Sequence, residues 1–84
     1  MIVTVEGILN EVNRPIVLAQ ATEGKMLLRL IYFPEKKLYE VDCIKNGVAV
    51  EDYAYSGKVA HNAVLKYNEA YQLEVVNENI KIHK

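Results

Sequence analysis

The fold is decided by residues 26–55, which read MLLRLIYFPEKKLYEVDCIKNGVAVEDYAY. Two breaks divide this stretch. Asn46 and Gly47 tolerate the positive φ angles that tight hairpin turns require, and Pro34 opens a charged loop before Leu38. Between the breaks the chain is apolar and rich in β-branched and aromatic residues. The stretch therefore predicts a meander of three antiparallel strands at 26–33, 38–45 and 48–55.

The first loop predicts how the first two strands pair. If residues 34–37 form a four-residue loop, Phe33 lies opposite Leu38 and Arg29 lies opposite Asp42. The second pair joins opposite charges across the strands, an attraction of about 0.2–1 kcal/mol. This pairing also sends the apolar side chains of both strands to matching faces.

The Asn-Gly turn leaves two registers open for the third strand. A two-residue turn places Asp42 opposite Glu51, where Arg29 on the neighbouring strand can offset the repulsion between the carboxylates. A bulged turn places Asp42 opposite Val50 instead. We favour the two-residue turn.

Alternation along the strands divides the side chains between two faces of the sheet. The first face carries Leu28, Leu30, Tyr32, Tyr39, Val41, Cys43 and Val50. The second face carries Leu27, Ile31, Phe33, Leu38, Ile44, Ala49, Tyr53 and Tyr55, with Arg29, Glu40, Asp42 and Glu51 among them. Because large exposed apolar patches are rare on soluble monomers, both faces need a cover.

A helix at 57–71 is predicted to cover the first face, with Ser56 as its N-cap. Its apolar side chains recur at helical spacing: Val59, Ala60, Ala63, Val64, Tyr67, Ala70 and Tyr71. We expect Val64 to lie in the core beneath this helix. Ile16–Glu23 predicts a short N-terminal helical segment that Gly24 ends, and this segment would cover part of the second face.

The two ends of the chain are less well defined by their sequence. Residues 1–13 fit either a short strand or a helical turn, and residues 73–84 fit one or two short strands. Together the patterns predict one α+β domain over residues 1–84, with a three- to five-stranded, mainly antiparallel sheet. A domain of 84 residues buries only about 60% of its unfolded surface, so oligomerisation is a common means of stabilising it.

Composition limits the cellular setting. The formal net charge is −1, and no basic cluster suggests duplex nucleic acid as a partner. No apolar run approaches the roughly 20 residues that a membrane helix needs, and the first residues lack the basic region of a signal peptide. The single cysteine, Cys43, excludes an internal disulfide. We therefore expect a cytoplasmic protein that does not enter a membrane.

No motif for catalysis appears in the sequence. Ser56, Gly57 and Lys58 resemble the end of a phosphate-binding loop, but Asp52 stands where that loop needs an earlier glycine and Val59 stands where it needs Ser or Thr. Ser56 is therefore read as a helix cap. Cys43 and His61 are a candidate nucleophile and base, but a mid-strand thiol facing a helix is expected to be buried and inert. The sequence thus predicts no enzyme and no catalytic residue.

A metal or cofactor site is not predicted either. Glu40, Asp42 and Glu51 converge on the second face, and carboxylates are ligands for hard cations. Arg29 in the same cluster already supplies a positive charge, so an ordinary ion-pair network is the simpler interpretation. The two histidines and Cys43 lack the spacing of metal ligands.

The second face is the best candidate for function. Tyrosine, which supplies contact area with a polar end, is enriched in protein interfaces. We predict a non-enzymatic protein-interaction module (an adaptor, regulator or inhibitor) that forms a homodimer and binds an unidentified protein. Small inhibitors made by phages and mobile elements, including anti-defence proteins, share this size and composition. The predicted contact residues are Phe33, Leu38, Glu40, Glu51, Tyr53 and Tyr55.

Binding of single-stranded nucleic acid is the alternative for the same face. Phe33, Tyr53 and Tyr55 would stack on bases. The acidic side chains Glu40, Asp42 and Glu51 would lie on that same face and repel phosphates, which disfavours this function.

Overall fold

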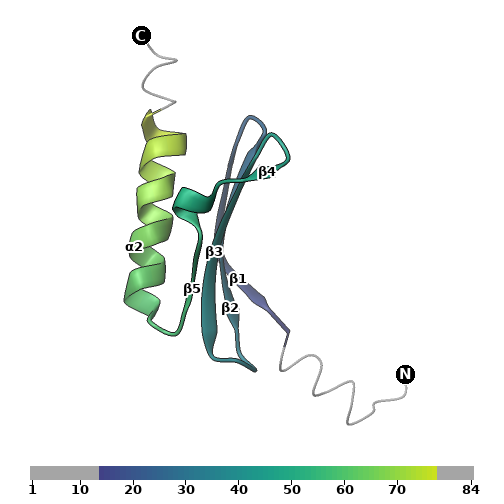
Figure 1. Cartoon of the computed structure of the whole chain (residues 1–84), viewed down its shortest axis with the longest axis vertical. Coiled ribbons are helices and arrows are strands. Elements are labelled where there is room, and N and C mark those ends of the chain that lie inside the picture. Colours follow the sequence, from purple (N-terminus) through teal and green to yellow (C-terminus); the bar gives the residue numbers. More distant parts are fainter. Residues whose placement is uncertain (1–13, 78–84) are drawn as a thin grey trace, which may run out of the picture.

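The computed structural model describes residues 14–77 and shows one helical layer on one side of an antiparallel sheet (Figure 1). In chain order the elements are β1 (Ile16–Glu23), β2 (Met26–Phe33), β3 (Leu38–Lys45), β4 (Val48–Ala49), the 3₁₀ helix η1 (Glu51–Tyr53), β5 (Tyr55–Gly57), α2 (Ala60–Tyr71) and the π-helical turn η2 (Gln72–Val76). The strands lie side by side in the order β1-β2-β3, and β4 and β5 both pair with β3. The predicted α+β class and mainly antiparallel sheet are confirmed. No helix in this part of the chain is long and apolar enough to cross a membrane.

The β2–β3 hairpin has the predicted strands and the predicted register. Both strands begin and end at the predicted residues. Phe33 pairs with Leu38, and Arg29 pairs with Asp42. The second turn is also as favoured, because Lys45 pairs with Val48 across a two-residue Asn-Gly turn. Asn46 and Gly47 have φ angles of 55° and 79°, the left-handed conformation that this turn requires.

Ile16–Glu23 is a strand, so the predicted N-terminal helix in this segment is wrong. β1 pairs antiparallel with β2 over its whole length, with a bulge between Val17 and Ala19. Gly24, with φ of 59°, stands in the tight turn between β1 and β2 and does not end a helix. Eight residues are too few for a helix that is stable alone, and pairing with β2 satisfies the backbone groups along the inner edge of the segment instead.

The predicted third strand is divided, and its second half has the opposite orientation to the predicted one. β4 follows the predicted register, with Ile44 opposite Ala49. The chain then leaves the sheet through η1 and returns as β5, where Tyr55 pairs with Val41. Straight pairing would have placed Tyr55 opposite Leu38. The excursion adds three residues, and an odd shift moves every later side chain to the other face.

The helix begins three residues later than predicted. Ser56 lies in β5, opposite Glu40, and is not a helix cap. Val59 is the N-cap residue of α2, and it makes no side-chain capping bond. After Tyr71 the chain continues as η2, so the predicted strand over the first residues of the 73–84 segment is wrong. The ambiguous segment 1–13 and the rest of the predicted C-terminal strand lie outside the described residues.

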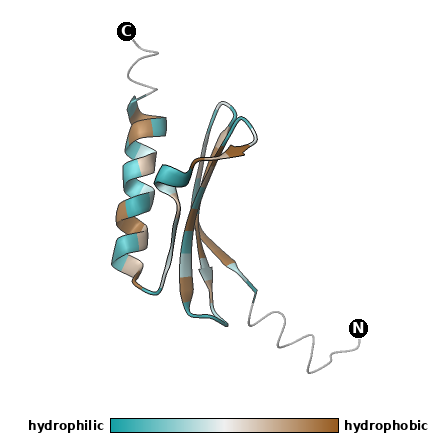
Figure 2. Cartoon of the chain, viewed as in Figure 1, coloured by the Kyte–Doolittle hydropathy of each residue, from teal (hydrophilic) through white to brown (hydrophobic). Residues whose placement is uncertain are grey.

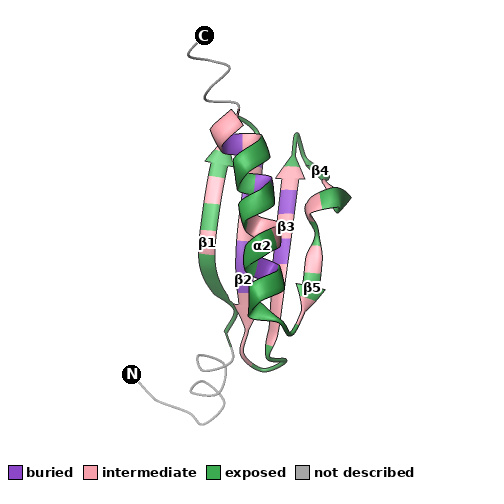
Figure 3. Ribbon diagram, turned by 90° about the vertical axis from the view of Figure 1, so that its left-hand side faces the viewer, coloured by how far each residue is buried: buried purple, intermediate pink, exposed green. Residues whose placement is uncertain are grey.

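The core lies between α2–η2 and the central strands (Figure 3). It is formed by Met26, Leu28, Leu30, Val41 and Cys43 from the sheet with Ala63, Ala70 and Val75 from the helical layer. The alanines are fully buried and allow the helix to lie close to the sheet. Val64 is 44% exposed, so its predicted place in the core is wrong. A residue adjacent to Ala63 points about 100° away around a helix, since an α-helix has 3.6 residues per turn.

The π-helical turn changes which residues of the last turn face the sheet. Seven residues separate Ala63 from Ala70, so continued α-helical spacing would next place Glu74 over the core. The wider turn of η2 places Val75 there, 8% exposed, and moves Glu74 to the border. The turn therefore keeps an apolar residue in the core and brings a carboxylate to its edge.

Candidate binding surfaces

The open face, as we name it, is the side of the sheet opposite α2. It is formed by Leu27, Arg29, Ile31 and Phe33 of β2 and by Leu38, Glu40, Asp42 and Ile44 of β3. Within residues 14–77, the helical elements all lie on the other side of the sheet (Figure 1). The strands β2 and β3 thus present a second, mainly apolar surface that these elements do not cover.

The apolar residues of the open face cover one another in part. Ile31 is only 7% exposed, although it lies outside the helix-side core. Leu27, Phe33, Leu38 and Ile44 are partly exposed. Neighbouring side chains on a flat sheet share their contact area, so no single residue projects far. The apolar side chains form two groups, Leu27 with Ile44 and Ile31 with Phe33 and Leu38, on either side of the row that holds Arg29 and Asp42.

An ion pair lies in the middle of this surface. Arg29 Nε donates to Asp42 Oδ1 at 3.1 Å, and Arg29 Nη2 donates to Asp42 Oδ2 at 2.8 Å. The hydrogen bond with Asp42 raises the pKa of Arg29, so the guanidinium remains charged. Because each charge is matched by the other, the pair does not break the apolar surface with a net charge.

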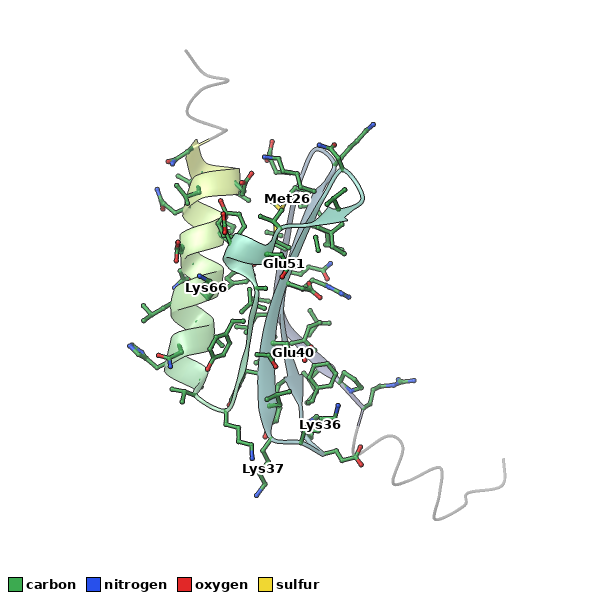
Figure 4. The ribbon with its side chains drawn as sticks, in the orientation of Figure 1. Met26, Lys36, Lys37, Glu40, Glu51 and Lys66 are labelled. Atoms are coloured by element: carbon green, nitrogen blue, oxygen red, sulfur yellow. The ribbon has the colours of Figure 1, made fainter. Side chains whose placement is uncertain are left out.

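Glu40 and Lys36 are the other charged residues associated with the open face (Figure 4). Glu40 is opposite Ile31 and forms no ion pair within the described chain. Lys36, in the loop between β2 and β3, lies over the ring of Phe33 with its Nζ 5.9 Å from the ring centroid. Such a contact at an exposed site contributes about 0.5–1 kcal/mol. Glu40 is therefore left as an unmatched negative charge on an apolar surface.

The structure brings together three of the six predicted contact residues. Phe33, Leu38 and Glu40 share the open face, as their places in the hairpin predicted. Tyr53 and Tyr55 pack against the core on the helix side, because of the three-residue excursion before β5. Glu51 is exposed in η1 and does not pair with Asp42. The prediction that all six share one face is wrong.

The two tyrosines are held on the helix side by hydrogen bonds. Tyr53 donates its hydroxyl hydrogen to Glu74 Oε1 at 3.0 Å, and Tyr55 donates to the carbonyl oxygen of Val59 at 3.3 Å. Burial and the adjacent Glu74 carboxylate raise the pKa of Tyr53 to about 12. Both hydroxyls therefore fasten the divided edge strand to the helical layer.

Glu74 is a polar contact that the sequence did not indicate. Its Oε2 accepts a hydrogen bond from Lys45 Nζ at 2.9 Å, in addition to the bond from Tyr53. These partners are 29 and 21 residues away in the chain, so no local motif joins them. A shallow depression beside this contact is lined by Glu23, Gly24, Met26, Lys45 and Glu74. The contact fixes η2 against the sheet.

Side chains that could carry chemistry are not assembled into a centre in the described region. Cys43 is 2% exposed, and burial raises the pKa of its thiol, which favours the unreactive protonated form. His61 is exposed on α2. No group of three or more His, Cys, Asp or Glu side chains among residues 14–77 is placed to hold a metal ion.

A second apolar surface lies along β1, where the sequence had predicted a helix. Ile16, Val17 and Leu18 are 48%, 49% and 51% exposed. Figure 2 shows this hydrophobic end of β1 to the right of the other strands, where it diverges from them. α2 also exposes large apolar residues, including Leu65 at 55%. The most exposed large apolar residue of the described chain is Val48 of β4, at 67%, and further exposed apolar residues lie on β1 and α2.

Comparison with known proteins yields no match to a protein family, a curated protein or a solved structure. Function must therefore be inferred from the surfaces themselves.

Proposed function

We propose that the protein is a small non-enzymatic interaction module that binds a partner protein through the open face. The observation that carries this proposal is a mainly apolar sheet surface with a neutralised ion pair at its centre and no described element over it. Protein interfaces combine an apolar centre with a few well-paired polar groups in the same way. An adaptor, a regulator and an inhibitor all act through such a surface.

The chemistry of the open face defines the partner that fits it. Arg29 and Asp42 form hydrogen bonds with each other, so they need no polar group from the partner, only a surface of matching shape. Glu40 adds a negative charge that forms no ion pair within residues 14–77 and lies next to Asp42 on the same strand and face. Burying that charge without a counter-charge is unfavourable. We therefore expect a partner surface of apolar side chains around one Arg or Lys that reaches Glu40.

The arrangement favours protein binding over single-stranded nucleic acid. Base stacking on a sheet needs several aromatic side chains on the same face. Phe33 is the one aromatic residue of the open face, since Tyr53 and Tyr55 pack on the helix side. Glu40 is acidic and repels phosphates.

We also propose a cytoplasmic location, which the lone cysteine supports because it suits a reducing compartment. Cys43 is free and buried in the core. Oxidising compartments favour paired cysteines in domains of this size, because disulfides supply the stability that a small core lacks.

Affinity capture with matched variants tests this function. The bait is the full chain, with Leu38→Asp on the open face and Leu65→Asp on the outer side of α2 as the control. Circular dichroism first verifies that both variants fold. We expect one protein, identified by mass spectrometry, to be recovered by the wild type and by Leu65→Asp and to be lost with Leu38→Asp. Recovery of the same protein by all three baits contradicts the proposal.

A titration with labelled single-stranded oligonucleotides at low salt tests the alternative. The interaction-module proposal expects no binding at micromolar concentration. If oligonucleotides bind, and Phe33→Ala abolishes the binding while Tyr71→Ala leaves it unchanged, the open face is a nucleic-acid-binding surface. Tyr71 is an exposed aromatic residue on α2, so it serves as a control for non-specific stacking.

A further inference from the structure

We propose that β1 pairs with β1 of a second copy of this chain, antiparallel and about a two-fold axis at Gln20. β1 is the outermost strand of the sheet and spans eight residues. Its inner edge pairs with β2, and no other strand of residues 14–77 pairs with its outer edge. The outer backbone groups of such a strand are a template for another strand.

The opposite edge of the sheet is not an equivalent template. It consists of β4, with two residues, and β5, with three, and η1 separates them. Short strands and interruptions are the features by which proteins prevent pairing at sheet edges. The contrast makes β1 the edge that can take up a strand.

β1 also lacks charged side chains over most of its length. From Ile16 to Thr22 all residues are uncharged, whereas protected edges usually carry lysine or other charges. The bulge at Leu18 limits regular pairing to residues 19–23. With the axis at Gln20, the regular part of the ladder covers residues 19–21 of both copies, and residues 22 and 23 pair with residues beyond the bulge.

The sequence of β1 is complementary to itself in this arrangement. With the axis at Gln20, Ala19 of each copy lies opposite Ala21 of the other, and the two Gln20 side chains meet. An amide side chain both donates and accepts hydrogen bonds, so two of them can pair. Beyond the bulge, Val17 meets Thr22 and Ile16 meets Glu23, so no like charges face each other.

The charge of the whole chain also permits self-association. Its formal net charge is −1, so two copies repel each other only weakly. Gln20 lies on the same side of the sheet as its pairing partner Arg29. An axis at Gln20 is then perpendicular to the sheet, and it places the open faces of both copies side by side on one surface. The pairing goes beyond the proposed function, because it makes the module bivalent.

Charge substitutions at Gln20 test the pairing. Gln20 is exposed, and its side chain is absent from the core. We expect light scattering to give the wild type twice the mass of one 9.6 kDa chain. Gln20→Lys and Gln20→Glu each place like charges at the axis and should weaken self-association by about tenfold. An equimolar mixture of the two variants should restore the dimer, because opposite charges then meet.

The same light-scattering measurement can also refute the pairing. Gln72→Lys, an exposed change on η2, is the matched control and should leave the dimer intact. Thermal unfolding verifies that each variant is folded, since Gln20 lies opposite Arg29 within the chain. A wild-type protein that is monomeric at all concentrations refutes the proposal. A dimer that both Gln20 variants retain places the contact on another surface and refutes it equally.

Discussion

Arg29 and Asp42 face each other across β2 and β3 and bind through two parallel hydrogen bonds of 3.1 and 2.8 Å. The planar guanidinium matches the two carboxylate oxygens in this geometry. The two side chains are 34% and 38% exposed, so water competes with the pair. Pairs at exposed sites contribute about 0.2–1 kcal/mol. The pair therefore marks the register of the hairpin more than it stabilises the domain.

Reversal of this pair should recover part of the stability that a single change removes. Arg29→Asp places two carboxylates opposite each other, and we expect the free energy of unfolding to fall by roughly 1 kcal/mol. The double variant with Asp42→Arg restores an attractive pair and should recover about half of the loss. Urea unfolding measures both values. As a control, Arg29→Asp combined with Glu51→Arg should recover less, because Glu51 lies in η1 and not opposite Asp42. Strictly additive losses in the first pair contradict this account.

The β2–β3 hairpin could be predicted to the residue because its signals are local. Its two strands alternate regularly, and turn residues stand at both ends of β3. Ile16–Glu23 carries no such turn chemistry apart from Gly24, and its few apolar residues fit either period. Its strand conformation depends on pairing with β2, which local periodicity does not contain.

Three of the six predicted contact residues lie on the open face, for a related reason. Phe33, Leu38 and Glu40 belong to the hairpin, so alternation alone placed them. Tyr53 and Tyr55 depend on the length of the excursion at η1, and one residue more or fewer reverses their face. The alternation of side chains along a strand predicts which face each residue occupies only as long as the pairing register continues.

The burial of α2 predicts opposite results at two adjacent positions. Val64 is 44% exposed, so Val64→Asp should change the free energy of unfolding by no more than about 0.5 kcal/mol. Ala63 is fully buried, and Ala63→Asp should prevent folding, since a buried carboxylate without a partner exceeds the reserve of a small domain. Thermal unfolding followed by circular dichroism compares them. A cooperative transition for Ala63→Asp at the wild-type temperature would show that the helix faces another way.

A side chain at position 57 is expected to clash with Tyr55, and a smaller residue at position 55 should relieve the clash. A Cβ atom at this position would lie 2.5 Å from the hydroxyl oxygen of Tyr55 and 2.8 Å from its Cζ. The Tyr55 hydroxyl is held by its bond to the carbonyl of Val59, so the ring cannot move without losing that bond. We expect Gly57→Ala to lower the free energy of unfolding by about 1–3 kcal/mol.

The double variant separates this clash from the backbone effect of replacing glycine. Tyr55→Leu removes the atoms nearest to the new Cβ, so Gly57→Ala should be much less harmful in that background. Double-mutant analysis of urea unfolding gives the coupling between the two sites. An equal loss from Gly57→Ala with Tyr55 and with Leu at position 55 would mean that the two side chains do not meet.

The bond between Tyr53 and Glu74 predicts a loss of stability at high pH. The folded protein raises the pKa of Tyr53 from 10 to about 12, chiefly through burial and then through the Glu74 carboxylate. The neutral hydroxyl is thus favoured in the folded state. Its contribution is complete below pH 10 and is lost as the pH rises from 10 to about 12, because the unfolded chain releases this proton first.

Tyr53→Phe should remove this alkaline dependence. In the wild type the free energy of unfolding should fall between pH 10 and 12 with an added slope below about 1.4 kcal/mol per pH unit, since Tyr53 is partly exposed. The variant lacks the added slope but is less stable at neutral pH by about 1 kcal/mol, because Glu74 loses a donor. Tyr67, whose pKa burial also raises, titrates in both proteins and cancels in the difference. Urea unfolding at a series of pH values measures that difference, which should narrow as the pH rises. Parallel curves for the two proteins up to pH 12 would show that Tyr53 ionises no differently in the folded and unfolded chain.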